Sequence, residues 1–353
     1  MTFNELLVKY RTISISEYDK GTRFEELMKN FLLSYPEYRE KFSDVWLWKD
    51  FPFRAEFGGK DVGIDIVTKT IDGEYWAVQC KCYAENTRID KPAVDSFLAT
   101  SSKIFCGQKF SARLWISTTN NWNDEAERAI RNQNPPVLRI GLQDLQNASV
   151  DWSKLDAGTF GEGVIKKFRE PLKHQFDAID AAEKYFQSHS RGKLIMSCGT
   201  GKTYTSLKIA EKLAPNGKVL FLVPSIALLS QTLSEWSTYA EKPLESICVC
   251  SDVTASKGRN EDIQQSVDLA LPATTDVEKI SARLKSARTD RLKVVFATYQ
   301  SLEKVSAANF EFDLIICDEA HRTTGYGTEA TAFTAIHDEN FIRGAKRLYM
   351  TAT

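Results

Sequence analysis

The sequence contains little of what soft-metal sites, disulfide frameworks or membrane segments require. Its four histidines all lie beyond residue 173, and its seven cysteines include no CxxC pair. Structural zinc sites are built from close pairs of such ligands, and disulfide frameworks use even numbers of cysteines. The N-terminus lacks an apolar signal-peptide core, and no apolar run is long enough to cross a bilayer. These absences favour reduced thiols in a soluble, cytoplasmic protein with no membrane partner.

An excess of charge of either sign is also missing. The 46 basic and 47 acidic residues give a formal net charge of −1, so the composition as a whole does not favour a nucleic acid partner. Any site for a polyanion must therefore be a local patch. The 353 residues, 42% of them hydrophobic, are enough to form two ordinary domains with buried cores.

The first domain is expected to span residues 1–155 as a compact α/β unit. Apolar residues at helical spacing predict a helix over 21–35, and strand-like runs follow at 61–70 and 75–83. Because Asp72-Gly73 is a typical turn pair, these two runs should form a hairpin. A helix that opens at Asp90-Lys91-Pro92, a strand, a second helix and a last strand should follow.

A Gly-rich stretch without periodicity predicts a linker at 156–167. The second domain, residues 168–353, alternates apolar strands with helices. This order predicts a parallel sheet covered by helices on both faces. The polar stretch from residue 251 to 291 interrupts the alternation, and we expect it to be a surface insertion.

A phosphate-binding loop is predicted where the strand-like run KLIMSC is followed by GTGKTYTSL. The glycines would let backbone N–H groups surround phosphate oxygens at the start of a helix. The lysine would reach the terminal phosphates, and the threonine after it would bind Mg²⁺. Met196 stands where the general pattern has glycine. The residues expected to bind ATP are Gly199, Thr200, Gly201, Lys202 and Thr203.

The run FDLIICDEAH supplies carboxylates at the end of an apolar strand. Unpaired charge at that depth is costly, and a metal ion with ATP phosphates would compensate it. Asp318 would hold Mg²⁺, and Glu319 would polarise the attacking water.

Together, CGTGKT, DEAH and TAT resemble motifs I, II and III of superfamily 2 helicases and translocases. In the expected order, LVPSIALLSQ (222–231) resembles motif Ia and ATYQSL (297–302) resembles motif Ib. The resemblance covers residues 168–353 and implies a RecA-like P-loop lobe whose motifs Ia and Ib contact a nucleic acid backbone. It also implies that Gln175 reads adenine, that His321 belongs to the nucleotide site, and that Thr351 and Thr353 couple hydrolysis to movement.

The sequence ends at Thr353, inside motif III. Motors of this kind have a second RecA-like lobe that supplies an arginine to the nucleotide. We therefore expect a fragment of a longer protein, which should bind ATP but hydrolyse it weakly, because such an arginine can be worth roughly 10³–10⁵ in rate.

The run YWAVQCKCY holds a candidate nuclease site. Side chains alternate along a strand, so Cys80 and Cys82 share one face, while Gln79 and Lys81 share the other. The cysteine face is apolar, and buried thiols explain it better than a metal site. Phosphodiester cleavage needs a carboxylate and a second oxygen ligand for a divalent metal, with a cation beside the attacking water. Asp65, Gln79 and Lys81 are residues of these types.

Register decides whether Asp65 joins this face. A two-residue Asp72-Gly73 turn would pair Asp65 with Cys80, on the wrong face, whereas one extra loop residue would pair it with Lys81. A hairpin salt bridge or solvated strand residues are the alternative interpretation of Asp65 and Lys81.

GKDVGIDIV (59–67) and QCK (79–81) resemble the Mrr-like branch of PD-(D/E)xK nucleases. The resemblance covers roughly residues 20–145 and implies a restriction-endonuclease-like α/β domain with a mixed sheet. It adds Glu25, on the preceding helix, as a further catalytic residue, with Glu26 as a weaker candidate. Gln79 replaces the common glutamate, as is usual in that branch.

A Mrr-like nuclease ahead of a superfamily 2 motor resembles the N-terminal part of type ISP restriction enzymes. This implies Mg²⁺-dependent cleavage of double-stranded DNA coupled to ATP-driven translocation, with a second RecA-like lobe, a methyltransferase and a target-recognition domain beyond residue 353. One alternative is a remodelling or repair translocase whose nuclease-like domain only binds DNA. Another is an RNA-directed DEAH-type helicase.

Overall fold

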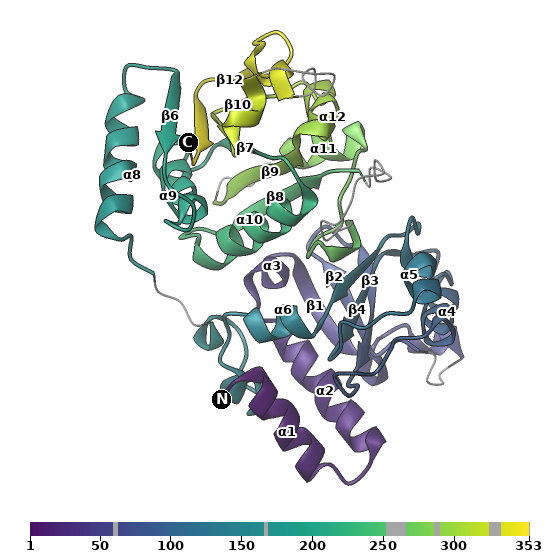
Figure 1. Cartoon of the computed structure of the whole chain (residues 1–353). Helices are drawn as coiled ribbons and strands as arrows, with labels where there is room; N and C mark the ends of the chain where they lie inside the picture. Colours follow the sequence, from purple (N-terminus) through teal and green to yellow (C-terminus); the bar gives the residue numbers. More distant parts are fainter. Residues whose placement is uncertain (59–62, 166–168, 252–265, 286–289, 325–332, 353) are drawn as a thin grey trace. The chain divides into compact units, whose positions relative to one another are not determined.

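The computed structural model describes the chain except for residues 59–62, 166–168, 252–265, 286–289, 325–332 and 353. It divides into two compact units, Met1–Lys167 and Phe168–Thr353 (Figure 1). No helix among the described residues is long and apolar enough to cross a membrane.

The first unit contains a five-stranded mixed sheet with strand order β1-β2-β3-β4-β5. The first three strands are antiparallel neighbours, and β3, β4 and β5 run parallel. The strands are β1 (Phe42–Leu47), β2 (Ile66–Thr70), β3 (Tyr75–Lys81), β4 (Phe110–Ser117) and β5 (Val137–Ile140). The predicted mixed sheet and hairpin are thus confirmed.

The helices near residues 21–35, after Asp90 and between the last two strands were predicted, and the other helices of this unit were not. The helices are α1 (Phe3–Ile13), α2 (Glu17–Leu32), α3 (Pro36–Arg39), α4 (Lys91–Thr100), α5 (Asp124–Ile130), α6 (Leu142–Asn147) and α7 (Trp152–Asp156), with 3-10 turns η1 (Trp48–Asp50), η2 (Arg54–Phe57) and η3 (Glu162–Val164). Helix α4 opens as expected, because Asp90 accepts a hydrogen bond from the Ala93 N–H and Pro92 lies in the first turn.

Helix α2 begins earlier than the apolar pattern predicts. The Ser16 side chain accepts from the Asp19 N–H and starts the helix at Glu17. Its apolar stripe is buried and contains Phe24, Leu27, Met28, Phe31 and Leu32. Each such side chain contributes about 1.5–3 kcal/mol when fully buried. Burial of this stripe fixes the helix that carries Glu25.

The segment after α7 packs on the first unit. The Gly161 N–H donates to the Ser34 hydroxyl at 2.8 Å, and Val164 is completely buried. Ile165 forms an isolated bridge with Val150.

The second unit contains a six-stranded parallel sheet with order β6-β13-β11-β7-β9-β8. The strands are β6 (Arg191–Ile195), β7 (Lys218–Val223), β8 (Leu244–Val249), β9 (Leu292–Thr298), β11 (Leu314–Cys317) and β13 (Arg347–Thr351), and β10 (Glu311–Phe312) pairs with β12 (Arg343–Gly344). The helices and 3-10 turns are α8 (Lys173–Tyr185), α9 (Lys202–Leu213), α10 (Ile226–Tyr239), α11 (Val277–Leu284), α12 (Leu302–Ala307), η4 (Ser266–Asp268), η5 (Tyr299–Ser301), η6 (Ala320–Thr324) and η7 (Ala335–His337).

Both faces of this sheet are covered, as predicted. On one face Phe221 of β7 packs edge-on against Trp236 of α10, with ring centroids 5.2 Å apart. On the other, the alternate β7 residues Leu220 and Leu222 join a core cluster with residues of α11 and α12. The alternation follows from the period of two along a strand.

The expected surface insertion at 251–291 is wrong for its described part. Residues 252–265 and 286–289 lie outside the described residues. In the remainder, Ile280 and Leu284 of α11 are 0% and 1% exposed and belong to the core cluster. Val277, Ile280 and Leu284 have helical spacing, which the surrounding charged residues mask in the sequence.

Candidate nuclease and nucleotide sites

The hairpin register places Asp65 opposite Gln79. Ile66 pairs with Val78, and the Asp65 N–H donates to the Val78 carbonyl at 2.9 Å. Neither predicted partner, Lys81 or Cys80, is correct. The Thr70 N–H donates to the Glu74 carbonyl, so residues 71–73 form the turn. The residue added to the Asp72-Gly73 pair is therefore Ile71, on the β2 side. Asp65 nevertheless reaches the face that carries Gln79.

The Asp65 carboxylate is held by two donors. Its Oδ2 accepts from the Gln79 side-chain amide and from the Cys80 N–H at 2.6 Å. Gln79 is 2% exposed, so the face expected to be polar is itself covered. The Gln79 Oε1 lies near Gly63, where an added Cβ would be 3.5 Å from it and 3.3 Å from the Ser96 hydroxyl of α4.

Glu25 and Lys81 lie around the same strand. Burial raises the pKa of the Cys80 thiol well above its usual value, and the charges of Asp65 and Glu25 raise it further, while Lys81 opposes them. All three charged groups therefore lie within electrostatic range of one sulfur. Glu25 is half-buried, whereas Glu26 is exposed and pairs with Lys49 at 3.7 Å.

The cysteines behave as apolar thiols. Cys80 is buried and Cys82 is half-buried, and burial raises the pKa of both. A protonated thiol is a poor metal ligand. Within the described parts of the chain, no three His, Cys, Asp or Glu side chains form a group that could hold a metal. Asp65 and Gln79 still suit Mg²⁺, which is usually bound by one or two protein carboxylates together with substrate phosphates and water.

The phosphate loop has the backbone that its glycines allow. Gly199 and Gly201 have φ angles of +75° and +83°, and Gly201 immediately precedes α9. A Cβ at Gly201 would lie 2.3 Å from the Gln175 Nε2, so no side chain fits there. Lys202 is the first residue of α9, and its Nζ lies 3.4 Å from the Met196 carbonyl.

Gln175 ties this loop to α8. Its Oε1 accepts from the Leu172 N–H at 2.9 Å, and its Nε2 donates to the Thr200 carbonyl at 2.8 Å. Gln175 is completely buried. His174 Nε2 lies 3.1 Å from the same carbonyl. The contact of His174 with the loop has no signal in the sequence.

Asp318 follows β11 and is 7% exposed. Burial raises its pKa to about 6, although the hydrogen bond from the Glu319 N–H and the charge of Lys202 oppose the rise. The P-loop lysine and the DEAH aspartate therefore act on one another, as ligands of one nucleotide would. Glu319 adopts a φ of +49°, an uncommon backbone conformation for a non-glycine residue that is often seen at functional sites.

His321 connects the DEAH segment to the last strand. Its Nδ1 lies 3.4 Å from the Glu319 carboxylate and 3.3 Å from the Thr351 hydroxyl of β13. Motifs II and III thus meet through one imidazole. Thr353, the other predicted coupling residue, lies outside the described residues.

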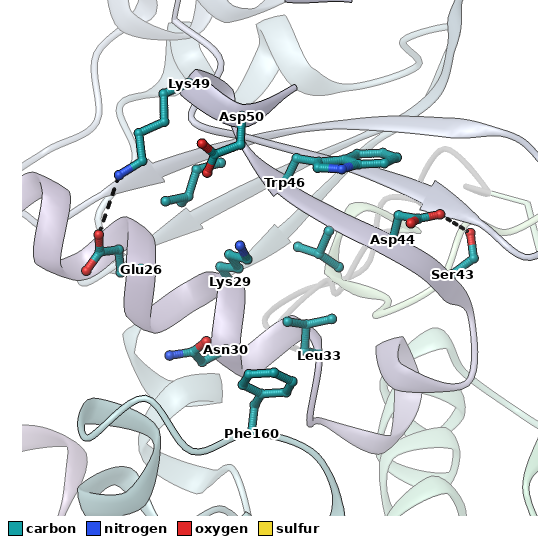
Figure 2. A pocket seen from close by; sticks show the side chains of 12 residues that line it. Glu26, Lys29, Asn30, Leu33, Ser43, Asp44, Trp46, Lys49, Asp50 and Phe160 are labelled. Atoms are coloured by element: carbon teal, nitrogen blue, oxygen red, sulfur yellow. Dashed lines mark hydrogen bonds and ion pairs between the residues drawn. The ribbon is translucent and has the colours of Figure 1, made fainter. Parts of the chain in front are cut away.

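A groove of about 640 Å³ lies between α2 and β1, beside the nuclease residues (Figure 2). Figure 2 shows the Lys49–Glu26 ion pair at one end and the Ser43–Asp44 hydrogen bond at the other, with Leu33 and Phe160 below them. On α2, the lining residue Glu26 is the chain neighbour of Glu25. After β1, the lining residue Leu47 is followed by Trp48, whose N–H donates to the Asp65 carbonyl at 2.7 Å. The sequence does not predict this groove.

Comparison with known proteins gives two family matches. The family described as "Restriction endonuclease" matches residues 33–162, and "Type III restriction enzyme, res subunit" matches residues 168–353. A probable helicase of African swine fever virus (isolate Pig/Kenya/KEN-50/1950) is 33% identical over 194 residues, which are 55% of this chain and 20% of the viral protein.

Among solved structures, the ATP-dependent type ISP restriction-modification enzyme LlaBIII bound to DNA matches with a TM-score of 0.82. The two chains are 35% identical, and the match covers 100% of this chain and 22% of the LlaBIII chain. A nuclease-deletion mutant of the type ISP enzyme LlaGI in complex with a DNA substrate mimic is 42% identical over 53% of this chain and 18% of its own, with a TM-score of 0.43. The chain thus spans about a fifth of the length of these relatives.

Proposed function

Since the chain belongs to the type III restriction enzyme res-subunit family and carries a restriction endonuclease domain ahead of that region, we propose that it couples Mg²⁺-dependent cleavage of double-stranded DNA to ATP-driven movement along it. The single observation that carries the nuclease part is the Asp65 carboxylate, fixed by the Gln79 amide and the Cys80 N–H beside Lys81. The DNA-bound state of LlaBIII supports DNA as the partner.

In the nuclease site, Asp65 and Gln79 would hold Mg²⁺, with Glu25 completing the acidic side. A bound Mg²⁺ supplies Lewis-acid polarisation of the phosphate and lowers the pKa of bound water. The Cys80 N–H keeps the Asp65 carboxylate oriented. Lys81, half-exposed at the end of β3, would supply the cation beside the attacking water and the phosphate.

In the nucleotide site, the N–H groups around Gly199 and Gly201 and the α9 N-terminus would bind the phosphates of ATP. Thr203 and Asp318 would hold Mg²⁺, and Lys202 would neutralise the terminal phosphates. Glu319 would orient water. His321 and Thr351 would transmit the structural change that accompanies hydrolysis to β13. Gln175 would keep the loop in position against α8, and to read adenine its buried amide would have to leave the backbone groups of Leu172 and Thr200.

Substitution of Asp65 and Lys81 tests the nuclease assignment. In a plasmid-nicking assay with Mg²⁺, Asp65→Ala and Lys81→Ala should each lower cleavage by at least about 10²-fold, the usual range for a lost acid–base or electrostatic group. Lys103→Ala, which removes an exposed lysine of the same unit, serves as the matched control. Undiminished cleavage by both site variants would refute the assignment.

A unit that binds DNA without cutting it is the second candidate. It is favoured by one contact: the nitrogen of the Gln79 amide, not its oxygen, faces Asp65. For Gln79 to bind Mg²⁺ beside Asp65, its amide must rotate so that Oε1 faces the ion. Melting of the chain with Mg²⁺ and with EDTA separates the candidates. A Mg²⁺-dependent rise in melting temperature that Asp65→Ala removes supports cleavage, and no rise supports the binding-only unit.

A further inference from the structure

The turn between α1 and α2 carries the most exposed large apolar side chains among the described residues. Ile15 is 94% exposed and Tyr18 is 83% exposed. The turn is nevertheless held in place, because the Ile15 N–H donates to the Asp19 carboxylate at 3.2 Å and the Asp19 N–H donates to the Ser16 hydroxyl at 3.0 Å. We call residues 11–23 the α1–α2 tip. One fixed turn thus presents two large apolar side chains to solvent, three residues apart.

Gly21 lies inside α2, three residues before the buried stripe begins at Phe24. Glycine is, after proline, the least favourable residue in a helix interior. Neither packing nor backbone conformation explains it here, because a Cβ would meet only the Glu25 Oε1, at 4.0 Å. The helix surface at Gly21 is therefore open to close approach by a partner.

One face of α2 leads from the tip to the nuclease site. Tyr18, Gly21 and Glu25 are spaced three and four residues apart, which places them on the same side of the helix. At a rise of 1.5 Å per residue, Tyr18 lies about 10 Å along the axis from Glu25.

The charges of the tip are mixed, with one more cation than carboxylates. Glu17 and Asp19 pair with Lys20 at 2.6 Å and Arg23 at 3.2 Å, and no carboxylate of the described residues lies within ion-pair distance of Arg11. One cation of the tip is thus in excess. Burial raises the pKa of Cys82, next to Lys81, while the charges of Lys20 and Arg11 oppose that rise, so the tip cations lie near the end of β3.

We propose that the α1–α2 tip is a DNA-contact surface. The duplex that enters the nuclease site lies along the tip, against Gly21. This inference rests on the proposed cleavage of DNA by this unit. Ile15 and Tyr18 contact sugars or base edges, and Arg11 contacts a phosphate. Apolar side chains used in this way are common in proteins that bind the minor groove. The restriction endonuclease match begins at residue 33 and therefore assigns no role to either helix.

Gly21→Ala separates a contact role from a structural one, because its two effects have opposite signs. A Cβ should favour the helix and raise the melting temperature of the chain by about 2–4 °C. The same methyl group should weaken binding of a fluorescein-labelled duplex, measured by anisotropy without ATP. A rise in melting temperature with unchanged DNA affinity would overturn the contact at Gly21.

The exposed side chains are tested with a matched control. Ile15→Ala combined with Tyr18→Ala should lower duplex affinity about tenfold, which corresponds to about 1.4 kcal/mol, without lowering the melting temperature. Ile104→Ala removes a 71% exposed isoleucine that follows α4, an element that Figure 1 shows apart from α1 and α2, and should change neither. Arg11→Ala should reduce the slope of log affinity against log salt by about 1.

DNA binding and DNA cleavage are measured separately, so that the DNA-contact proposal and the nuclease assignment can be refuted independently. If the tip variants bind duplex like the parent chain, the surface is not a DNA contact, whatever the chain cleaves. If the tip variants lose affinity while Asp65→Ala and Lys81→Ala cleave normally, the surface stands and the nuclease assignment falls.

Discussion

Asp318 combines a proposed Mg²⁺-binding role with an environment that disfavours its charge. Its burial raises its pKa from 3.8 to about 6. The folded state therefore binds this proton more tightly than the unfolded chain does. The associated stability is fully present below about pH 4 and is lost as the pH rises to about 6.

Asp318→Asn should stabilise the second unit at pH 8 by up to about 3 kcal/mol, since one pKa unit corresponds to about 1.4 kcal/mol. Near pH 4 the variant and the parent should be equally stable. Urea denaturation in metal-free buffer at both pH values measures this, with Glu311→Gln, at an exposed carboxylate, as the control. The same variant should lose ATP hydrolysis. A variant less stable than the parent at pH 8 would contradict the burial argument.

At the scale of elements, a histidine joins the segment after the DEAH motif to β13. His337 Nε2 lies 3.2 Å from the Thr323 carbonyl of η6, and its Nδ1 lies 3.1 Å from the Tyr349 hydroxyl of β13. Because a carbonyl only accepts, Nε2 carries the proton, and Nδ1 accepts from Tyr349. The His321–Thr351 contact joins the same two segments, so the segments that carry motifs II and III are connected twice.

His337→Ala and Tyr349→Phe should each lower the kcat of DNA-stimulated ATP hydrolysis about two- to tenfold, the scale of one hydrogen bond, with little change in KM for ATP. In the double variant the losses should not add, because both remove the same bridge. The His189→Ala and Tyr185→Phe pair, whose rings stack 4.1 Å apart in the same unit, is the matched control. Additive losses would show that His337 and Tyr349 act independently.

Sequence patterns predicted most elements but not their register. The parallel strands were recognisable because long apolar runs alternate with helices, and the P-loop was recognisable from its glycines. The hairpin register was not, because loops of two or three residues both accommodate Asp72-Gly73, and each shift moves Asp65 to another partner. Helix α11 was missed because its apolar residues stand among charges. The Gln175–Thr200 contact joins residues far apart in sequence, so no local pattern encodes it.

At the scale of the whole molecule, the two phosphate chemistries that we propose belong to units that each have their own sheet and core. The proposed nuclease residues Asp65, Gln79 and Lys81 all belong to the first unit. The proposed nucleotide residues Lys202 and Asp318 belong to the second. If each site is complete within its unit, each chemistry should survive the loss of the other.

Lys202→Ala should therefore abolish binding of a fluorescent ATP analogue, because the terminal phosphates lose their cation, and leave ATP-independent nicking by Mg²⁺ unchanged. Lys81→Ala should show the reverse, with nicking lost and ATP binding retained. Lys193→Ala, which removes an exposed lysine of β6, should retain both. Loss of nicking in Lys202→Ala without any nucleotide present would mean that the second unit supplies part of the nuclease site. The movement along DNA that we propose would then have to act on cleavage through shared residues, and not only by delivering DNA to an independent site.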